Sequence, residues 1–495
     1  MTLAKKSCLT RSLIAASAVL FAAGCAVGPN FKRPAAPQVG AYTPAPITAT
    51  SSTPDVAGGE AQQIVEGGDI PGEWWRLFHS KPLDDLIARS LKANPDLKAA
   101  QAALLVAREN VRAQRGAYYP SAAVSFSADR SKTSNVVSPF TSSGALYYSL
   151  YTPQVSVGFL PDVFGLNRRT VESLKAQEQQ ARFALAATHI TLSSNVAAAA
   201  IQEASLRAQI AATQELISIN TNMLQIVRSQ FETGYVSRLD VAAQEAQLAQ
   251  VTANLPPLLK QLAQQRDFLA VLAGGFPNQE LAEEFELSDL QLPQELPLSL
   301  PSQLVEQRPD VRQAEENLHF ASAQIGVAVA NRLPSFPLTA NVGSMALMFS
   351  SMFSSGTAFW DLAAGVTQPI FQGGTLLHRE RAARAAYVQA GEQYRSTVLK
   401  AFQNVADSLN ALQQDAYGLK IAAAAKDAAG VTLGLVTKQY QSGYVSYLSL
   451  LNAEQTYQTA VINLTQAQAN RFTDSAALFQ ALGGGWWNRP DIPTN

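Results

Sequence analysis

The chain has 495 residues, of which 47% are hydrophobic and only 15% charged, and its formal net charge is −1. An average soluble domain is about 25% charged, and a near-zero charge balance argues against a nucleic-acid partner, which needs a basic face. Ala, Gln, Ser and Thr take the place of the missing charges. This mixture suits long helices in close contact, because Ala has the highest helix propensity.

The first 24 residues are typical of an export signal. Basic residues precede an apolar run from Leu13 to Phe21, and small residues follow as far as Cys25. This run is too short to span a bilayer as a helix, which takes about 20 residues. We therefore expect residues 1–24 to be removed. Cys8 leaves with them, so Cys25 would be the only thiol of the mature chain.

The end of the signal resembles the lipobox of bacterial lipoproteins, in which the new N-terminal Cys receives lipid. Here it reads Ala22-Ala23-Gly24-Cys25, with Ala22 where that motif prefers Leu. We expect lipid on Cys25. The alternative is an ordinary signal cleaved near Gly24. Ala26 follows in place of the Asp that resembles an inner-membrane retention signal, which favours the outer membrane.

Most of the mature chain is one unit present twice. Each copy has a Pro-Asp helix start, at Pro95 and Pro309, and later a Gly-Tyr-Val-Ser segment, at 234–237 and 443–446. Before the first copy the sequence is rich in Pro, Ala, Thr, Ser and Gly, which indicates an extended tether. The expected organisation is a signal peptide (1–24), a lipid-anchored extended segment (25–70), a first repeat (71–276), a linker (277–300), a second repeat (301–487) and a C-terminal tail (488–495).

Each copy is expected to hold a short helix, two strands, a very long helix, a tight break and a second long helix. No Pro and no internal Gly interrupt residues 168–231, and heptad stepping places apolar residues along one side, with Glu203 and Asn220 as exceptions. Such stripes indicate packing, in an array of coiled-coil helices. We expect strands at about 121–130, 146–160, 336–347 and 358–370, and long helices at about 166–232, 237–273, 374–441 and 446–482.

The expected strands alternate between apolar and polar residues, which marks two faces in different environments. Val124, Phe126 and Ala128, for example, interleave with Ser125 and Ser127. Two hairpins over a soluble core would show the same alternation. In an exported lipoprotein, strands of about ten residues fit a membrane barrel. Four strands cannot close one, because the smallest membrane barrels use about eight. Three chains would supply twelve strands and leave room for a passage.

No constellation of catalytic or metal-binding residues appears. Gly373-Gly374-Thr375 lacks the spacing of a phosphate-binding loop, and no nucleophile elbow is present. We therefore expect no enzymatic activity, no metal and no cofactor beyond the lipid on Cys25. The four histidines are scattered without a second ligand at metal spacing and are interpreted as surface or packing residues: His79, His189, His319 and His378.

Several motifs together resemble the TolC/OprM family of outer-membrane efflux factors, in its NodT-type lipoprotein subgroup. They are the stretch from Cys25 to Pro34 (Cys-Ala-Val-Gly-Pro-Asn-Phe-Lys-Arg-Pro), Trp74-Trp75 before Leu83, and the two pairs of repeated motifs. The resemblance implies a mainly α fold with a small transmembrane β part. It further implies a homotrimer with a twelve-stranded outer-membrane barrel and a periplasmic helical barrel. Its partners would be a periplasmic adaptor, an inner-membrane pump and outer-membrane lipid.

By position, the resemblance puts the adaptor-docking tips at the two Gly-Tyr-Val-Ser segments: Gly234, Tyr235, Val236, Ser237, Gly443, Tyr444, Val445 and Ser446. These residues could equally serve only to make the turns. Relatives have acidic residues near a gate, which suggests Asp240. The corresponding place in the second copy is Ser449, and Asn452 stands where some relatives have Asp. Asp240 could instead be a first-turn acid favoured by the helix dipole.

The expected function is a passive exit duct for small toxic compounds such as drugs or metals. One alternative is the same architecture serving type I protein secretion. Another is a coiled-coil lipoprotein that spaces two membranes without a pore, although a spacer has no use for four alternating strands. The sequence does not indicate which compounds are exported or which pump class is the partner.

Overall fold

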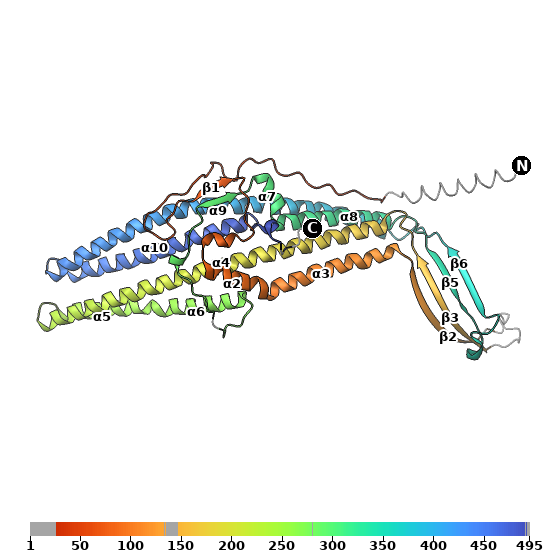
Figure 1. The fold of residues 1–495 in the computed structure, drawn as a ribbon, viewed down its shortest axis with the longest axis horizontal. Helices are drawn as coiled ribbons and strands as arrows, with labels where there is room; N and C mark the ends of the chain where they lie inside the picture. The colour runs from red at the N-terminus through yellow and green to blue at the C-terminus, as the bar shows by residue number, and fades with distance from the viewer. Residues whose placement is uncertain (1–25, 133, 135–146, 280, 491, 493–495) are drawn as a thin grey trace. The chain divides into compact units, whose positions relative to one another are not determined.

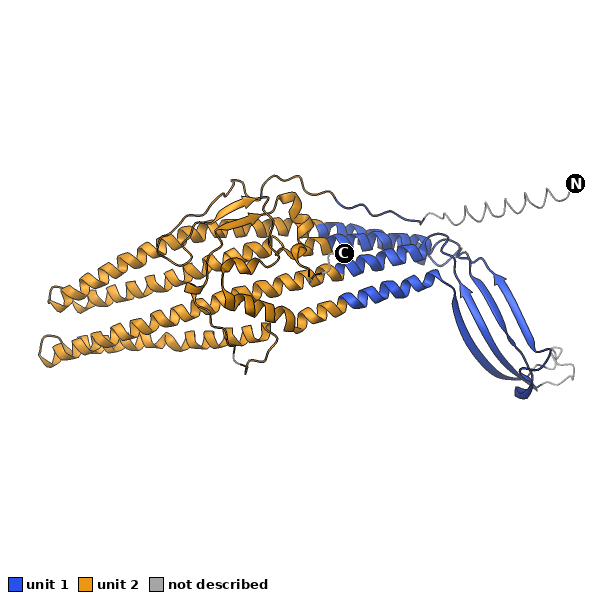
Figure 2. Cartoon of the chain, in the orientation of Figure 1, with its two compact units in different colours: residues 1–34, 104–180, 314–394 blue, residues 35–103, 181–313, 395–495 orange. Residues whose placement is uncertain are grey.

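The computed structural model describes residues 26–132, 134, 147–279, 281–490 and 492. Cys25 and the expected signal peptide lie outside these residues. The chain divides into two compact units, each assembled from separate segments (Figure 2): unit 1 from residues 1–34, 104–180 and 314–394, and unit 2 from residues 35–103, 181–313 and 395–495.

Helices make up most of the described chain (Figure 1). The two longest, one in each repeat, have 67 residues each. The α-helices of the first repeat are α2 (Lys81–Ala93), α3 (Pro95–Arg115), α4 (Leu166–Glu232), α5 (Arg238–Ala253) and α6 (Leu255–Leu272), and those of the second are α7 (Pro301–Gln307), α8 (Pro309–Ala330), α9 (Thr375–Gln441) and α10 (Tyr447–Ala481). Short 3-10 turns lie at Trp74–Phe78, Gly116–Tyr118, Leu287–Asp289, Phe349–Ser351 and Trp486–Asn488.

The second long helix of the first repeat differs from expectation. One helix was expected over about 237–273, but the structure has α5 and α6, separated at Asn254. Pro256 and Pro257 follow this residue at the start of α6. Proline has no N–H to donate and its ring clashes with the preceding turn, so the helix is interrupted there and restarts. The equivalent helix of the second repeat, α10, is continuous.

The tether and the linker contain structure that the sequence did not predict. Strand β1 (Gln63–Glu66) lies in the expected tether and pairs in parallel with β4 (Glu295–Leu298) in the expected linker. Neither strand has the length or alternation that would identify it alone. The two segments therefore stabilise each other through a pairing that joins distant parts of the chain.

Unit 2 has a core of aromatic side chains. Trp74 is fully buried and stacks on Phe479, with ring centroids 5.3 Å apart. Arg471 is buried beside this core. It donates to the carbonyl oxygens of Leu412 and Glu60, at 3.1 and 3.2 Å. Burying a charge is tolerated only when its hydrogen bonds are satisfied, so this arginine fastens the tether to α9 and α10.

Candidate functional site: a two-faced sheet and paired hairpin tips

Unit 1 contains an antiparallel sheet of four strands in the order β2-β3-β5-β6. Its strands are β2 (Ser121–Lys132), β3 (Tyr147–Phe159), β5 (Leu338–Ser344) and β6 (Ala358–Ala364). The hairpin of the first repeat joins that of the second through the β3–β5 pairing. The two copies thus supply one continuous sheet.

The second-repeat strands are shorter than expected, seven residues each against about 336–347 and 358–370. Pro337 stands immediately before β5, and Pro369 lies beyond β6. Proline cannot donate to a strand ladder. Past these ends the pairing continues as isolated bridges, one between Ser335 and Thr367 and one between Tyr151 and Ala346.

The register gives the sheet one apolar and one polar face. Val124 lies opposite Val155, which lies opposite Val342, which lies opposite Trp360, so these four side chains share a face. The neighbouring row on the same face runs from Ala122 through Val157 and Ala340 to Leu362. Rows of the other face are polar or small: Ser121, Gly158, Thr339 and Ala363 in one, and Ala123, Ser156, Asn341 and Asp361 in the next.

The apolar face is open in the single chain. Val124, Trp360 and Leu362 are largely exposed. Strands β2 and β6 each pair with one other described strand, so each presents an open edge. The uncovered apolar face is unfavourable in water, and the two free edges are not tolerated in lipid. The sheet therefore requires both an apolar solvent and neighbouring strands.

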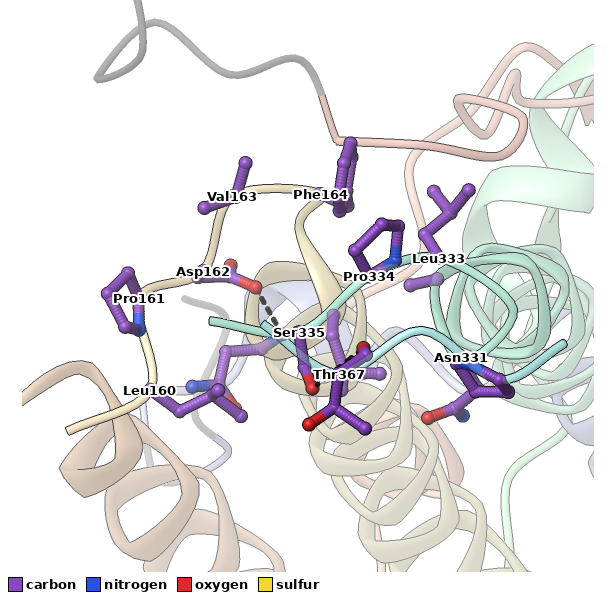
Figure 3. Close-up of a pocket in the computed structure, with 14 residues that line it drawn as sticks. Leu160, Pro161, Asp162, Val163, Phe164, Asn331, Leu333, Pro334, Ser335 and Thr367 are labelled. Carbon is purple, nitrogen blue, oxygen red and sulfur yellow. Dashed lines mark hydrogen bonds between the residues drawn. The ribbon is translucent and has the colours of Figure 1, made fainter. Parts of the chain in front are cut away.

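The polypeptide passes from strand to helix through a short, well-bonded connection (Figure 3). The carboxylate of Asp162 accepts from the backbone N–H groups of Asn167 and Arg168, at 2.8 and 2.9 Å. These are among the first N–H groups of α4, which have no partner within the helix. A cavity of about 180 Å³ lies here, between residues 160–167 and residues 330–335. Asp162 fixes the direction in which α4 leaves the sheet.

Residues 26–34, the N-terminal segment, lie against α4 and α8 within unit 1. Arg169 of α4 is buried and donates to the Val27 carbonyl oxygen at 2.9 Å and to Asn30 Oδ1 at 2.8 Å. Gly28 has φ +89°, and a Cβ there would lie 2.5 Å from the Cα of Gly326. Only glycine fits both the backbone conformation and this close approach.

The same segment contacts an ionised cluster. Arg33 pairs with Glu315 at 3.0 Å. Phe31 packs on α8 beside His319, whose ring nitrogens contact Glu172 and Glu316. The sequence interpretation treated His319 as an ordinary surface or packing residue. It packs on Phe31 and is also part of the contact that holds the N-terminal segment. These partners were not predictable, because Glu172 belongs to the other repeat.

The two hairpin tips in unit 2 have the same backbone conformation. Gly234 and Gly443 have φ +80° and +77°, a region that L-residues rarely adopt. Ser237 and Ser446 then cap α5 and α10, each side chain accepting from the backbone N–H three residues later. These residues therefore make the turns. Their docking role stays a prediction.

Asp240 acts as a capping residue in this structure. Its Oδ2 accepts from the backbone N–H of Ser237 at 2.8 Å and from the Ser237 hydroxyl at 2.7 Å. This is the reciprocal arrangement of a capping box. The gate role suggested for Asp240 stays a prediction.

Below the tips, a polar network that the sequence did not reveal joins the two hairpins. Gln244 of α5 is fully buried and donates to Asn220 Oδ1 of α4 at 3.1 Å, and Tyr447 of α10 donates to Gln244 Oε1. Tyr440 of α9 donates to Gln230 Oε1 at 3.2 Å. A cavity of about 770 Å³ opens at the tips, between the two Gly-Tyr-Val-Ser segments.

The two polar exceptions in the heptad stripe are explained by these contacts. Asn220 belongs to the network above. Glu203 is buried and accepts from Arg207 at 2.9 Å and from Arg266 of α6 at 3.0 Å. Within the described part of the chain, no group of three or more His, Cys, Asp or Glu side chains could hold a metal ion.

The model of the family described as outer membrane efflux protein matches the chain twice, over residues 86–275 and 300–484. The chain belongs to this family. The resemblance read from the sequence is thus confirmed, and the family model falls on both repeats. The probable efflux pump outer membrane protein TtgC of Pseudomonas putida is 29% identical, over 97% of each chain. The probable outer membrane lipoprotein SilC of Salmonella typhimurium is 28% identical, over 96% of this chain and 98% of the relative.

Solved structures share the fold. The outer-membrane channel OprN superposes with a TM-score of 0.82 at 24% identity, over 93% of this chain and 100% of that chain. The mainly helical fold with a small β part is therefore the fold of this family. The chain is an outer-membrane efflux component with a large helical part.

Proposed function

We propose that three copies of the chain assemble into the exit duct of a tripartite efflux system. Each copy supplies four strands to a closed barrel of twelve and its long helices to a periplasmic helical barrel. The duct conducts passively. A pump in the inner membrane drives transport, a periplasmic adaptor joins the pump to the duct, and the chain itself catalyses no reaction and holds no metal.

The observation that carries this proposal is the two-faced sheet with its free edges. In a closed barrel, each β6 pairs with the β2 of the next copy, so no edge remains. The rows containing Val124 and Leu362 then face lipid. The rows containing Ser156 and Asn341 line a polar lumen, which is the pattern of membrane barrels with an aqueous passage.

A second feature supports assembly with other copies. Helix α9 exposes apolar side chains along one line, spaced by eleven residues or twice eleven: Leu377, Val388, Leu399 and Ile421. Eleven residues complete three turns, so these side chains share one side of the helix. An apolar line of this length is covered most simply by a helix of the next copy.

The names of the relatives guide the substrate class. TtgC is named as an efflux pump component, which supports the export of small toxic compounds over protein secretion. We assign adaptor docking to the two tips, around the cavity between Gly234 and Gly443. Asp240 is proposed to act at the gate there in addition to its capping role.

We also assign the lipid to Cys25. The bonds between Arg169 and residues 26–30 hold the chain directly after this cysteine. SilC is named as an outer membrane lipoprotein. Mass spectrometry of the mature N-terminus tests the assignment, and a free Cys25 thiol in membrane-extracted protein would contradict it.

Purified protein in a planar bilayer tests the channel. We expect discrete conductance steps and a native mass of three chains. Adjacent positions of β2 provide matched variants. Val124→Arg places a charge on the lipid face, which costs up to about 2–4 kcal/mol at the bilayer midplane, whereas Ser125→Arg places it in the lumen. Val124→Arg should abolish insertion while Ser125→Arg changes conductance only. A membrane-inserted trimer without conductance would favour the spacer alternative.

A further inference from the structure

The connection between β5 and β6, residues 345–357, has an unusual composition, and we name it the apolar loop. No charged residue occurs between Arg332 and Asp361. Three of the five methionines of the chain lie in the loop, with two phenylalanines: Met345, Met348, Met352, Phe349 and Phe353. A loop that faces water ordinarily carries polar and charged side chains instead.

Several polar groups of the apolar loop are bonded within the loop and its base. The hydroxyl of Ser344 donates to the Met352 carbonyl oxygen, and that of Thr357 donates to the Ser354 carbonyl oxygen at 2.8 Å. The Met345 N–H donates to the Thr357 carbonyl oxygen at 2.8 Å. Irregular backbone is not tolerated in hydrocarbon, so these bonds allow the loop to lie at the membrane interface, with only side chains reaching the hydrocarbon.

Most large apolar side chains of the loop are exposed, although Met352 is buried. Met348 and Phe349 are each 63% exposed, and Phe353 is 82% exposed. The loop therefore presents several large apolar side chains at its surface. Met and Phe side chains are favourable on such a surface only when it meets an apolar partner.

The apolar loop extends the apolar face of the sheet. Ala346 and Tyr151 exchange backbone hydrogen bonds of 2.9 and 3.1 Å, which continues the β3–β5 pairing into the loop. Phe349 makes edge contacts with Tyr151 and Phe126, at centroid distances of 5.8 and 6.4 Å. Both partners lie on the face that carries Val124.

A crevice of about 390 Å³ lies where the loop meets this face. The loop contributes Phe353 to its lining. Four further lining residues come from the apolar rows or their continuation: Val124, Pro153, Val155 and Val342. The crevice is open, and its apolar side is bordered by polar residues, namely Gln154, Ser344, Ser354 and Thr357. Its apolar side suits a hydrocarbon chain.

We propose that the apolar loop is a membrane anchor, whose exposed Met and Phe side chains insert among the acyl chains of outer-leaflet lipid, with one acyl chain in the crevice beside Phe353. This inference rests on the proposed barrel. Strand β5 runs from α8 to the loop, so the loop lies at the end of the sheet away from the helices (Figure 1). With the helices in the periplasm, that end meets the outer leaflet.

Spin-label accessibility in reconstituted full-length trimers tests the proposal. Three residues have matched exposure in the single chain but different expected surroundings: Val124 at 83%, Phe353 at 82% and Tyr235 at 85%. Each is replaced singly by cysteine and labelled, and the unsubstituted protein supplies the background from Cys25. Collisions with oxygen report hydrocarbon, and collisions with a water-soluble nickel chelate report water.

We expect the label at Phe353 to resemble that at Val124, with high oxygen and low nickel accessibility, while the label at Tyr235 shows the reverse. Met348→Cys provides a second position in the loop if Phe353→Cys does not assemble. High nickel accessibility at both loop positions, or low accessibility to both reagents, would overturn the anchor while leaving the barrel intact. High nickel accessibility at Val124 would overturn the barrel itself, and the anchor with it.

Discussion

The imidazole ring of His319 stacks on the phenyl ring of Phe31, with centroids 4.4 Å apart and planes 13° apart. Its two ring nitrogens lie 3.2 Å from Glu172 and from Glu316. The hydrogen bond to Glu172, followed by that to Glu316, raises the pKa of His319 to about 9. The same contact lowers the pKa of Glu172.

This raised pKa predicts that the N-terminal segment is bound less strongly to α4 and α8 at alkaline pH. The folded pKa lies above the unfolded value of about 6.5, so the stabilisation is complete below pH 6.5 and is lost as the pH rises through about 9. His319 is a quarter exposed, and solvent screening limits the effect to about 1 kcal/mol. Proteolysis of residues 26–34 should accelerate over this window.

The comparison variant is His319→Gln, which should remove most of that pH dependence. His378→Gln is the matched control, because His378 is an exposed histidine of α9 in the same unit. An unchanged pH profile in His319→Gln would rule out the imidazolium as its source.

Gly28→Ala should release the N-terminal segment at every pH. The added Cβ would lie 2.5 Å from the Cα of Gly326. The alanine would also have to adopt φ +89°, a backbone conformation that costs an L-residue about 1–2 kcal/mol. Limited proteolysis measures the release. Gly40→Ala serves as the control, because a Cβ at Gly40 meets nothing within 4 Å. Equal cleavage of both variants would contradict the steric explanation.

Tyr447→Phe should loosen the contact between the two hairpins. Removing the hydroxyl leaves the buried Gln244 Oε1 without its donor, and an unsatisfied buried group costs about 1–3 kcal/mol. We expect a higher basal conductance in bilayers and greater susceptibility of cells to large antibiotics. Tyr444→Phe removes a hydroxyl from a side chain that is 83% exposed at the tip, and should change neither. The network would have no gating role if both variants conduct like the unaltered protein.

Glu454→Gln should stabilise the protein more at pH 8 than at pH 5. Glu454 of α10 is 3% exposed, and neither carboxylate oxygen has a hydrogen-bond partner among the described residues. Burial raises its pKa to about 7 from 4.5. Ionisation of the folded protein is thus unfavourable, and this destabilisation is absent below about pH 4.5 and complete above about pH 7.

The thermal midpoint of the solubilised protein at the two pH values measures this difference. Glu245→Gln is the control, since Glu245 is exposed and paired with Arg228 at 2.7 Å. Its pKa is lowered, chiefly by the hydrogen bond to Arg228, so the same substitution there should give no gain. A gain at Glu454 that is equal at both pH values would indicate improved packing and not relief of a buried charge.

The features that sequence reasoning predicted depend on local periodicity. The apolar positions of β2 could be assigned to one face because strand side chains alternate with a period of two. The long helices could be bounded because no Pro and no internal Gly interrupt residues 168–231 and a Gly-containing turn follows each of them. In both cases the residues that carry the pattern lie within or next to the strand or helix that they predict.

The features that escaped prediction depend on contacts between distant residues. Nothing in the sequence around Arg169 indicates that it binds residues 26–30. Likewise, nothing around Gln244 indicates its hydrogen bond with Tyr447 of the other repeat. The short pairing of β1 with β4 joins a tether to a linker. Only the break at Pro256 and Pro257 had a local signal, and these prolines could have ended the expected helix at 254.

That break makes the two hairpins of one chain mechanically unequal. Helix α10 is a single rod of 35 residues, whereas α5 and α6 are two shorter rods joined at Asn254. Bending at this joint breaks fewer intrahelical hydrogen bonds than bending within α10, because Pro256 and Pro257 have no N–H to donate. In a ring of three chains, jointed and rigid hairpins would alternate around the axis. If the helical end of the duct widens, the hairpins that contain α5 and α6 would move further than those that contain α10. The widening would then have threefold and not sixfold symmetry.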